Sequence, residues 1–190
     1  MSLQHSVTSS EHLTPEELEA GLPTILTAPR DEGVLELIVR RPGVEERQVV
    51  EEATLDLEEG LVGDNWRARG RSKGRRPPNP KAQITVTGSR MVALVARTPE
   101  RWPLAGDQLY VDLDLSDENL PPGTRLQIGS AVIEVTDEPH TGCEKYRARF
   151  GMDALAFAST PQGRSLNLRG INARVVEPGT VRNGDAVRKL

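Results

Sequence analysis

Alternating apolar and polar residues recur in short runs along the chain and predict β-strands. Two pairs of runs are separated by a short glycine-containing turn, residues 34–40 from 45–51 and residues 124–128 from 131–136. Each pair is typical of an antiparallel hairpin. Residues 109–115 alternate strictly, which predicts a strand with one face in a core and the other toward solvent.

The remaining patterns predict further strands and a few helices. Strand-like runs occur at residues 82–87, 171–176, 180–182 and 186–188, and helix-like runs at 89–96 and 150–158. Thr14-Pro15 is a typical helix start, with acidic residues in the first turn, and this helix is expected to end near Gly21. About eight short strands without βαβ alternation indicate a mainly β protein. We expect a twisted, mostly antiparallel β-barrel with two or three peripheral helices.

The 190 residues suit one domain with a small appended element. We expect residues 1–30 to form an N-terminal leader with a short helix, and residues 31–190 to form a single barrel domain. Residues 67–80 are rich in glycine, proline and arginine and are expected to be disordered or to cover a ligand.

Composition indicates a soluble protein whose core is aliphatic, since aromatic residues make up 3% of the chain. The longest apolar run, residues 91–96, is far shorter than a membrane span, and the first twenty residues lack the apolar centre of a secretory signal. We therefore expect a cytoplasmic protein with no membrane partner.

The net charge of −4 conceals a strong segregation of charges along the chain. Residues 65–99 hold nine bases and no acid, and residues 139–190 hold nine bases and four acids. If these segments meet, they would form a positive cleft suited to an anionic small molecule; otherwise they are solvated surface. Nucleic acid is an unlikely partner, because the chain is acidic overall and its aromatic residues are not interleaved with the bases.

The lone cysteine, Cys143, is the main candidate for chemistry. It is either a small buried hydrophobe or a reactive thiol, and Lys145, Arg147, Arg149 or a cationic His140 beside it would favour a thiolate. The preceding Gly142 would give the backbone unusual freedom. Hydrolysis by a His140–Cys143 pair and zinc binding are both disfavoured, because the chain offers few histidines and no second cysteine. A single thiolate would suffice to bind a soft metal or to carry a persulfide.

Several motifs resemble those of the MOSC domain, which is named for the C-terminal domain of molybdenum cofactor sulfurases. They are Gly60-Leu61-Val62-Gly63-Asp64, Gly106-Asp107-Gln108-Leu109, Asn119-Leu120-Pro121-Pro122-Gly123-Thr124, Pro139-His140-Thr141-Gly142-Cys143-Glu144-Lys145-Tyr146 and Leu168-Arg169-Gly170-Ile171-Asn172. They span about residues 58–188, and the chain is similar to the small stand-alone bacterial members. The resemblance implies a twisted barrel of the MOSC and pyruvate-kinase-barrel type, with Cys143 as the important cysteine.

The resemblance implies three activities: binding of molybdenum cofactor (molybdopterin), transport of sulfur as a persulfide, or reduction of N-hydroxylated compounds by bound cofactor. Cys143 would be the catalytic residue and the molybdenum ligand. A cysteine desulfurase or a redox protein would be the partner. The alternative is a non-catalytic module that binds and delivers a cofactor, because the longer N-terminal domain of the reductases is missing unless residues 1–57 replace it. Whether the chain is an enzyme, a molybdenum-dependent oxidoreductase or a sulfur transferase, stays open.

Residues that would contact the cofactor come from the basic segments and from the motifs. They are Arg67, Arg69, Asn119, His140, Thr141, Lys145, Arg147, Arg169 and Asn172. Asn119 has a structural alternative at its turn. The family is also associated with pyridoxal phosphate, but that cofactor needs a dedicated lysine, and none of Lys73, Lys81, Lys145 and Lys189 is favoured.

Overall fold

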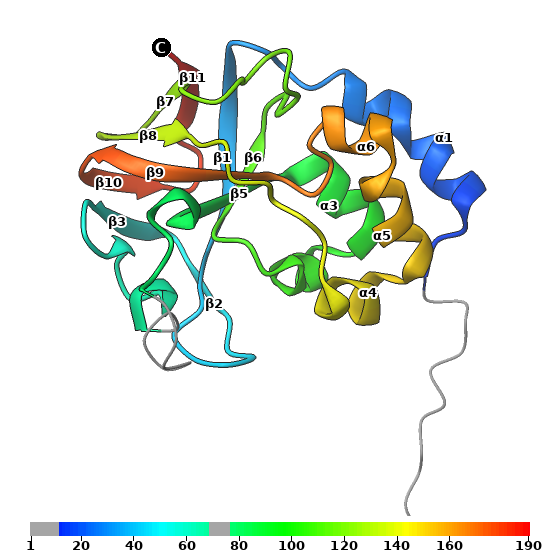
Figure 1. Ribbon diagram of the computed structural model, residues 1–190, viewed down its shortest axis with the longest axis horizontal. Helices are drawn as coiled ribbons and strands as arrows, with labels where there is room; N and C mark the ends of the chain where they lie inside the picture. The colour runs from blue at the N-terminus through cyan, green and yellow to red at the C-terminus, as the bar shows by residue number, and fades with distance from the viewer. Residues whose placement is uncertain (1–11, 69–76) are drawn as a thin grey trace, which may run out of the picture.

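A closed β-barrel forms one half of the molecule and a layer of helices the other (Figure 1). The computed structural model describes residues 12–68 and 77–190. The barrel strands are β1 (Glu32–Arg40), β5 (Ile84–Gly88), β6 (Leu109–Asp112), β7 (Arg125–Ile128), β8 (Ala131–Val135), β9 (Ile171–Glu177) and β11 (Ala186–Lys189). They follow the order β11-β7-β8-β9-β5-β6-β1, and pairing of β1 with β11 closes the ring. The predicted β-barrel is confirmed.

Strand pairing is antiparallel throughout the described barrel except between β5 and β6. Parallel neighbours need a crossover, which here runs through α3 (Ser89–Ala96) and the 3-10 helix η2 (Pro99–Ala105). Both predicted hairpins are present, β7 with β8 and β1 with β2 (Gln48–Val50). A small second sheet pairs β3 (Glu52–Asp56) with β4 (Gly60–Leu61) and with β10 (Gly179–Arg182).

Two apolar clusters build the core. The cluster inside the barrel is aliphatic and includes Leu109 and Val111, whereas Tyr110 between them belongs to a second cluster under the helices. Alternation along β6 therefore feeds both clusters, because successive side chains of a strand point to opposite faces. The strand that the sequence predicts as half-solvated is in fact covered by helices on its outer face.

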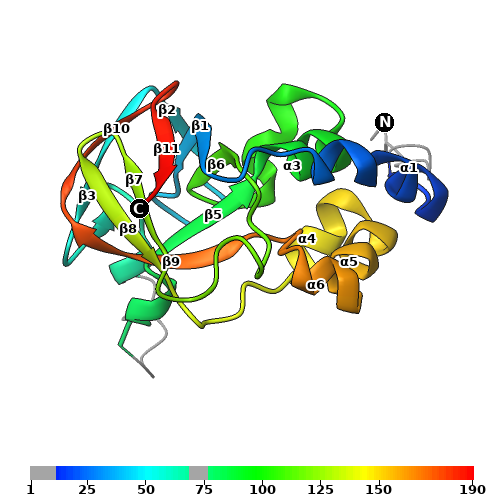
Figure 2. The same ribbon diagram turned by 90° about the horizontal axis from the view of Figure 1, so that it is seen from above.

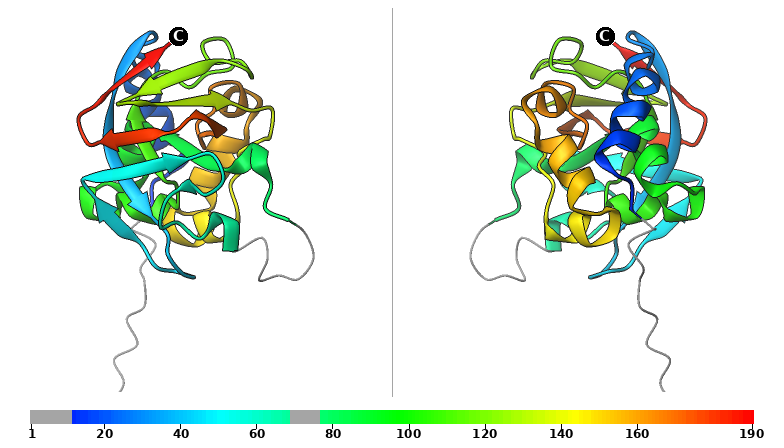
Figure 3. Two further views of the ribbon diagram at one scale, coloured as in Figure 1. Left: turned by 90° about the vertical axis from the view of Figure 1, so that its left-hand side faces the viewer. Right: turned by 90° about the vertical axis from the view of Figure 1, so that its right-hand side faces the viewer.

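The helices lie together at one side of the barrel (Figure 2), and their layer faces the viewer in the right-hand view of Figure 3. They are α1 (Pro15–Leu26), α3, α4 (Glu144–Phe150), α5 (Met152–Ser159) and α6 (Pro161–Ser165), with the 3-10 helix η2. The other 3-10 helix, η1 (Pro80–Ala82), lies on the barrel and contacts β9. This layer is larger than the sequence predicts, because the single helix expected at 150–158 is preceded by α4 and followed by α6. None of the described helices has the length and apolar character needed to cross a bilayer.

Helix α1 begins as predicted and ends later than predicted. Thr14 accepts a hydrogen bond from the Glu17 backbone N–H while the Glu17 side chain accepts one from the Thr14 N–H, which is a capping box. Gly21 does not end the helix. A Cβ at Gly21 would lie 2.6 Å from Leu94 Cδ1, so the glycine serves close packing of α1 on α3.

Candidate functional site

Cys143 directly precedes α4, at the end of the segment that leaves β8 and crosses in front of β9 in the view of Figure 1. Its side chain is exposed. Its carbonyl accepts the first hydrogen bond of the helix, from the Arg147 N–H at 3.0 Å, but its thiol makes no capping hydrogen bond to the described helix. The sulfur is therefore accessible to a ligand or a partner, and the packing alternative for this cysteine is wrong.

A buried charged network stands behind this segment. His140 Nε2 lies 2.6 Å from Asp107 Oδ1, and Arg169 Nη1 donates to Asp107 Oδ2 at 2.6 Å. Asp107 is fully buried, and the His140 and Arg169 side chains are 11% and 9% exposed. His140 and Arg169, which are distant in the sequence, thus both contact the carboxylate of Asp107 just before β6. These contacts fix the His140 end of the Cys143 segment to the barrel.

The charges of this network follow from its burial. Burial alone would raise the pKa of Asp107, but the charge of Arg169 and the hydrogen bonds from its neighbours lower that pKa to about 2. Burial and the nearby Arg169 lower the pKa of His140 below its ordinary 6.5. At neutral pH Asp107 is therefore ionised, and neutral His140 donates its Nε2–H to Asp107.

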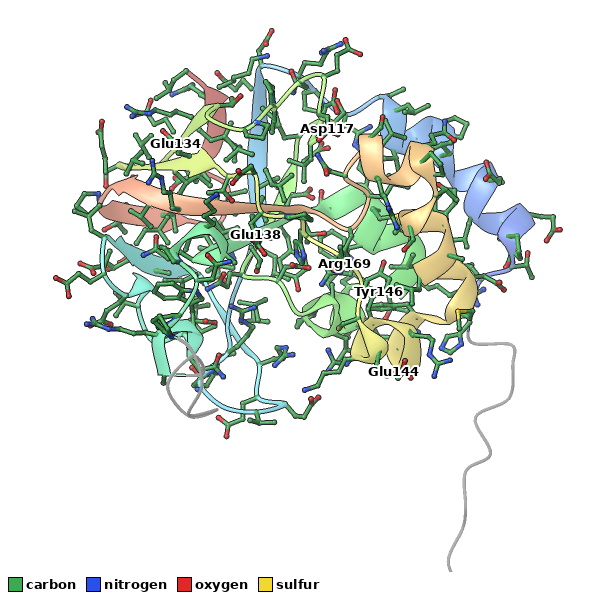
Figure 4. The ribbon with its side chains drawn as sticks, viewed as in Figure 1. Asp117, Glu134, Glu138, Glu144, Tyr146 and Arg169 are labelled. Carbon is green, nitrogen blue, oxygen red and sulfur yellow. The ribbon has the colours of Figure 1, made fainter. Side chains whose placement is uncertain are left out.

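Arg169 also holds α4. Its guanidinium carbon lies 4.9 Å from the centre of the Tyr146 ring, within the range of a cation–π contact, and Figure 4 shows the two side chains together between the barrel and the helices. Burial raises the pKa of Tyr146 to about 12, so the ring stays neutral. The Tyr146 and Phe150 rings pack edge to face with centres 5.0 Å apart. The network thus positions both sides of Cys143, the loop before it and the helix after it.

A cavity of about 700 Å³ opens beside this segment, between β9 and the α5–α6 helices. His140, Thr141 and Gly142 form part of its wall, and Leu155 lines it from α5. The wall ends at Gly142, so Cys143 is the next residue along the chain and lies outside the wall. This volume suits a small organic ligand.

The charge of the cavity wall is mixed. Asp117, Asp137 and Glu138 line it together with Arg164 and Arg169, and Figure 4 labels Asp117, Glu138 and Arg169. The positive cleft expected from the basic segments is therefore not formed by this cavity.

The single thiol sets what kind of metal group the protein could hold. Within residues 12–68 and 77–190, no three Cys, His, Asp or Glu side chains gather in a way that would bind a metal ion. A metal held through Cys143 would take its other ligands from outside the protein. The molybdenum cofactor fits this donor set, because its pterin dithiolene and oxo groups supply the other ligands.

Comparison with known proteins identifies the family. The family model for the MOSC domain matches residues 79–188, more than half of the chain. This chain belongs to the MOSC domain family. A search among curated proteins finds no match.

Solved structures share the MOSC fold of this chain. The YuaD protein from Bacillus subtilis is 18% identical with a TM-score of 0.58, and the match covers 82% of this chain and 94% of that one. YiiM from Escherichia coli is 21% identical with a TM-score of 0.53, covering 83% and 69%. A protein described as hypothetical is 22% identical with a TM-score of 0.57, covering 84% and 68%. At these identities the likeness concerns the fold.

In the MOSC domain described here, some of the site residues predicted from the sequence come together. His140, Thr141 and Asn172 line the cavity with Arg169, next to Cys143. Asn172 is buried on β9, where its side chain donates to the Glu138 carbonyl at 3.1 Å. It therefore supports the segment that leads to Cys143.

Other predicted residues lie elsewhere or are already paired. Asn119 is buried, donates hydrogen bonds to the Arg30 and Asp114 carbonyls and accepts one from Lys189. This is a structural arrangement, and Asn119 does not line the cavity although its neighbour Leu120 does. Lys145 pairs with Glu45 and Arg147 with Glu144. Arg67 pairs with Glu58, with Arg67 Nη1 3.3 Å from Glu58 Oε2. Arg69 lies outside the described residues.

Sequence reasoning missed Asp107 as a site residue. Asp107 lies in the Gly106-Asp107-Gln108-Leu109 motif, just before the strand expected at residues 109–115, but nothing in that pattern indicates that its carboxylate is buried. Sequence reasoning also missed the buried ion pair between Arg41 and Asp64, in which Arg41 Nε lies 2.8 Å from Asp64 Oδ2. This pair joins the end of β1 to the Gly63-Asp64 turn.

Proposed function

We propose that this MOSC domain binds the molybdenum cofactor through the thiolate of Cys143. The observation that carries the proposal is an exposed thiol that makes no hydrogen bond to the start of α4. It lies on a segment that the Asp107–His140–Arg169 network fixes in place. A positioned and accessible sulfur is what a soft metal requires of a protein ligand. When bound, the cofactor would supply two-electron redox chemistry at molybdenum.

The surrounding residues would orient and enclose the group held at Cys143. The cavity offers room for the organic part, with His140 and Thr141 on the wall nearest the thiol. Neutral His140 keeps Nε2–H on Asp107, so its other ring nitrogen is left as a hydrogen-bond acceptor. Arg169 donates its hydrogen bonds to Asp107 and to the Ala105 carbonyl. Its role is therefore to position the segment that leads to Cys143.

Molybdenum content tests this proposal directly. The protein is purified from cells that make the cofactor, and molybdenum is measured per chain by mass spectrometry. We expect near-stoichiometric molybdenum in the wild type and its loss in Cys143→Ser. Met152→Ala is the matched control, because Met152 is another exposed sulfur-bearing residue, at the start of α5. Molybdenum that survives Cys143→Ser would contradict the assignment.

Turnover separates an oxidoreductase from a delivery module. The loaded protein is supplied with a chemical reductant and an N-hydroxylated compound, and formation of the reduced amine or amidine is followed. Turnover that is lost in Cys143→Ser supports an oxidoreductase, whereas stoichiometric molybdenum without turnover supports the non-catalytic alternative.

Sulfur transfer is a second candidate, favoured by the position of Cys143 outside the cavity wall. An exposed thiol can be reached by a partner such as a cysteine desulfurase. Its thiolate would take the outer sulfur of the donor persulfide, forming a Cys143 persulfide and leaving the donor as a thiol. The test is incubation with a desulfurase and cysteine, with intact-mass analysis before and after reduction. A gain of one sulfur atom that reductant removes supports this candidate. Absence of both molybdenum and persulfide would overturn both candidates.

A further inference from the structure

A group of cationic side chains lies around Gly106, on the face of α4 that turns toward the β1–β2 hairpin. Lys145 and Arg149 are one helical turn apart on α4, and Arg47 comes from the hairpin. A Cβ placed on Gly106 would lie 3.7 Å from Arg47 Nη2 and 3.8 Å from Arg149 Nη1. Two guanidinium groups from separate elements therefore converge on one point. Lys145, Arg149 and Arg47 are called the α4–hairpin cluster below.

The α4–hairpin cluster has more positive than negative charge. Arg47 forms no ion pair with the described acids: its Nη1 donates to the Glu46 carbonyl at 2.6 Å, and its buried Nε has no described partner. Burial, with the charges of Arg149 and Arg41, lowers the pKa of Arg47. The neighbouring Arg41 is neutralised by Asp64. Like charges converge here without full compensation, which is the arrangement of an anion-binding site.

One carboxylate of the chain occupies the cluster. Glu45 accepts hydrogen bonds from Lys145 through Oε1 and from Arg149 Nη2 through Oε2, the latter at 2.5 Å. Its side chain is 56% exposed, at the tip of the hairpin. Its backbone φ of 62° is in the left-handed region, which costs free energy for a residue other than glycine. One carboxylate held from a strained backbone balances only one of three cations.

We propose that the α4–hairpin cluster binds the phosphate group of a ligand, and that the Glu45 carboxylate is an internal occupant which this phosphate displaces. A phosphate monoester carries about 1.5 to 2 negative charges and three acceptor oxygens, so it matches the three cations better than one carboxylate does. Arginine pairs and lysine are the usual phosphate partners in proteins. The site does not use the Cys143 thiol and stands apart from the molybdenum proposal.

Calorimetric titration tests the phosphate site. Inorganic phosphate and glycerol 3-phosphate are titrated at constant ionic strength into the wild type and into Glu45→Gln. We expect the neutral glutamine to compete less well, so Glu45→Gln should bind phosphate several-fold more tightly. Arg47→Gln should weaken binding by roughly tenfold, the scale of one charge-assisted hydrogen bond. Equal binding of both probes assigns the site to the phosphate group of a larger ligand, and binding of inorganic phosphate alone assigns it to the free ion.

Matched variants separate this site from general attraction of anions. Glu32→Gln and Arg125→Gln remove exposed members of the Glu32–Arg188 and Arg125–Glu134 pairs on the barrel, and both should leave the affinity unchanged. Thermal unfolding confirms that each variant is folded, and Cys143→Ser should bind phosphate as the wild type does. The proposal is overturned if Glu45→Gln binds no more tightly than the wild type, or if Arg125→Gln weakens binding as much as Arg47→Gln.

Discussion

Asp107 carries the most consequential charge in the molecule, because its carboxylate is completely buried and shared by two cationic or polar partners. A buried carboxylate is tolerated only when hydrogen bonds and opposite charge replace its hydration. Arg169 supplies the charge, and His140 supplies a further donor. The same contacts tie the turn before β6 to the Cys143 segment, so the stability of Asp107 and the position of the thiol depend on the same atoms.

Replacing Arg169 with a neutral residue of similar length should be strongly destabilising. We expect Arg169→Met to lower the free energy of unfolding by about 3–5 kcal/mol, because it leaves the Asp107 charge buried without its partner. Urea unfolding followed by circular dichroism measures the loss. Arg182→Met, which breaks the exposed Arg182–Glu52 pair, should cost less than about 1 kcal/mol. Similar losses in the two variants would contradict the role assigned to the network.

The network should also make the protein sensitive to acid. Folding lowers the pKa of His140 below 6.5, so the unfolded state binds more protons as the pH falls below 6.5, and stability falls with it. The pKa of Asp107 moves from 3.8 to about 2, which contributes about 2 kcal/mol above pH 4 that is lost between about pH 4 and 2. Urea unfolding at a series of pH values measures both steps.

Variants assign the two steps to their residues. His140→Gln should flatten the dependence on pH just below 6.5, and Asp107→Asn should remove the loss at lower pH. His12→Gln serves as the control, because His12 lies outside the network. A pH profile that His140→Gln leaves unchanged would show that His140 is not the titrating group.

The sequence identified the residues of the site better than it identified their partners. Cys143 was singled out because it is the lone cysteine, and His140 because it lies three residues before it. Asp107 could not be assigned a role, because the opposing charge of Arg169 comes from the far end of the chain. The same holds for Glu45, whose partners on α4 are about a hundred residues away in sequence.

Among the elements, the junction of the Cys143 segment with α5 depends on a missing side chain. Gly142 does not have a positive φ, so the conformational freedom expected there is not used. A Cβ at Gly142 would instead lie 2.2 Å from Leu155 Cδ1, and the glycine serves close contact between the loop and the helix.

Substituting Gly142 should displace this segment, and shortening Leu155 should restore it. We expect Gly142→Ala to cost about 1–3 kcal/mol, the usual effect of overpacking, and to change the rate at which iodoacetamide alkylates Cys143. The double variant Gly142→Ala/Leu155→Ala should return the alkylation rate toward that of Leu155→Ala alone. Additive effects of the two substitutions would mean that the side chains do not meet.

Hairpins and helix caps were predictable, because neighbouring residues in the sequence determine them. The capping box at Thr14 and the β7–β8 hairpin are examples, and both are formed. The predicted end of α1 near Gly21 was wrong, because Gly21 packs against Leu94 and the helix continues to Leu26. Contacts between helices override such local signals, and they cannot be read from neighbouring residues.

For the whole molecule, the two apolar clusters share strands and should unfold together. Val39 and Tyr110 belong to the cluster under the helices, whereas their neighbours Ile38 and Leu109 belong to the barrel interior. Neither cluster can lose β1 or β6 without exposing the other. We therefore expect a single cooperative unfolding transition for the barrel and the helical layer.

The two tryptophans test this cooperativity. Trp66 is buried close to η1, where its Nε1 donates to the Asn79 carbonyl at 3.2 Å, and Trp102 packs on the cluster under the helices. In Trp66→Phe and in Trp102→Phe, the remaining fluorescence and the circular dichroism should give the same urea midpoint. Different midpoints within one variant would show that the two halves unfold separately.

The closed barrel architecture was predictable from the number and pattern of short strands, but the pair of strands that closes it was not. Pairing of β1 with β11 joins Glu32 to Arg188, and no local pattern specifies such a distant register. The parallel contact of β5 with β6 was equally hidden, because its crossover consists of short helices that read as a surface connection.

Closure of the ring through β1 and β11 also has a consequence for the newly made chain. β1 is synthesised long before β11, so the part of its edge at residues 32–34 keeps unpaired N–H and C=O groups until residues 186–188 have left the ribosome, whereas residues 38–40 can pair early with β2. Non-local pairing of this kind slows folding and leaves strand edges open to other chains. The nascent chain is therefore most prone to aggregation just before synthesis of β11, and chaperones that shield strand edges would act at that stage.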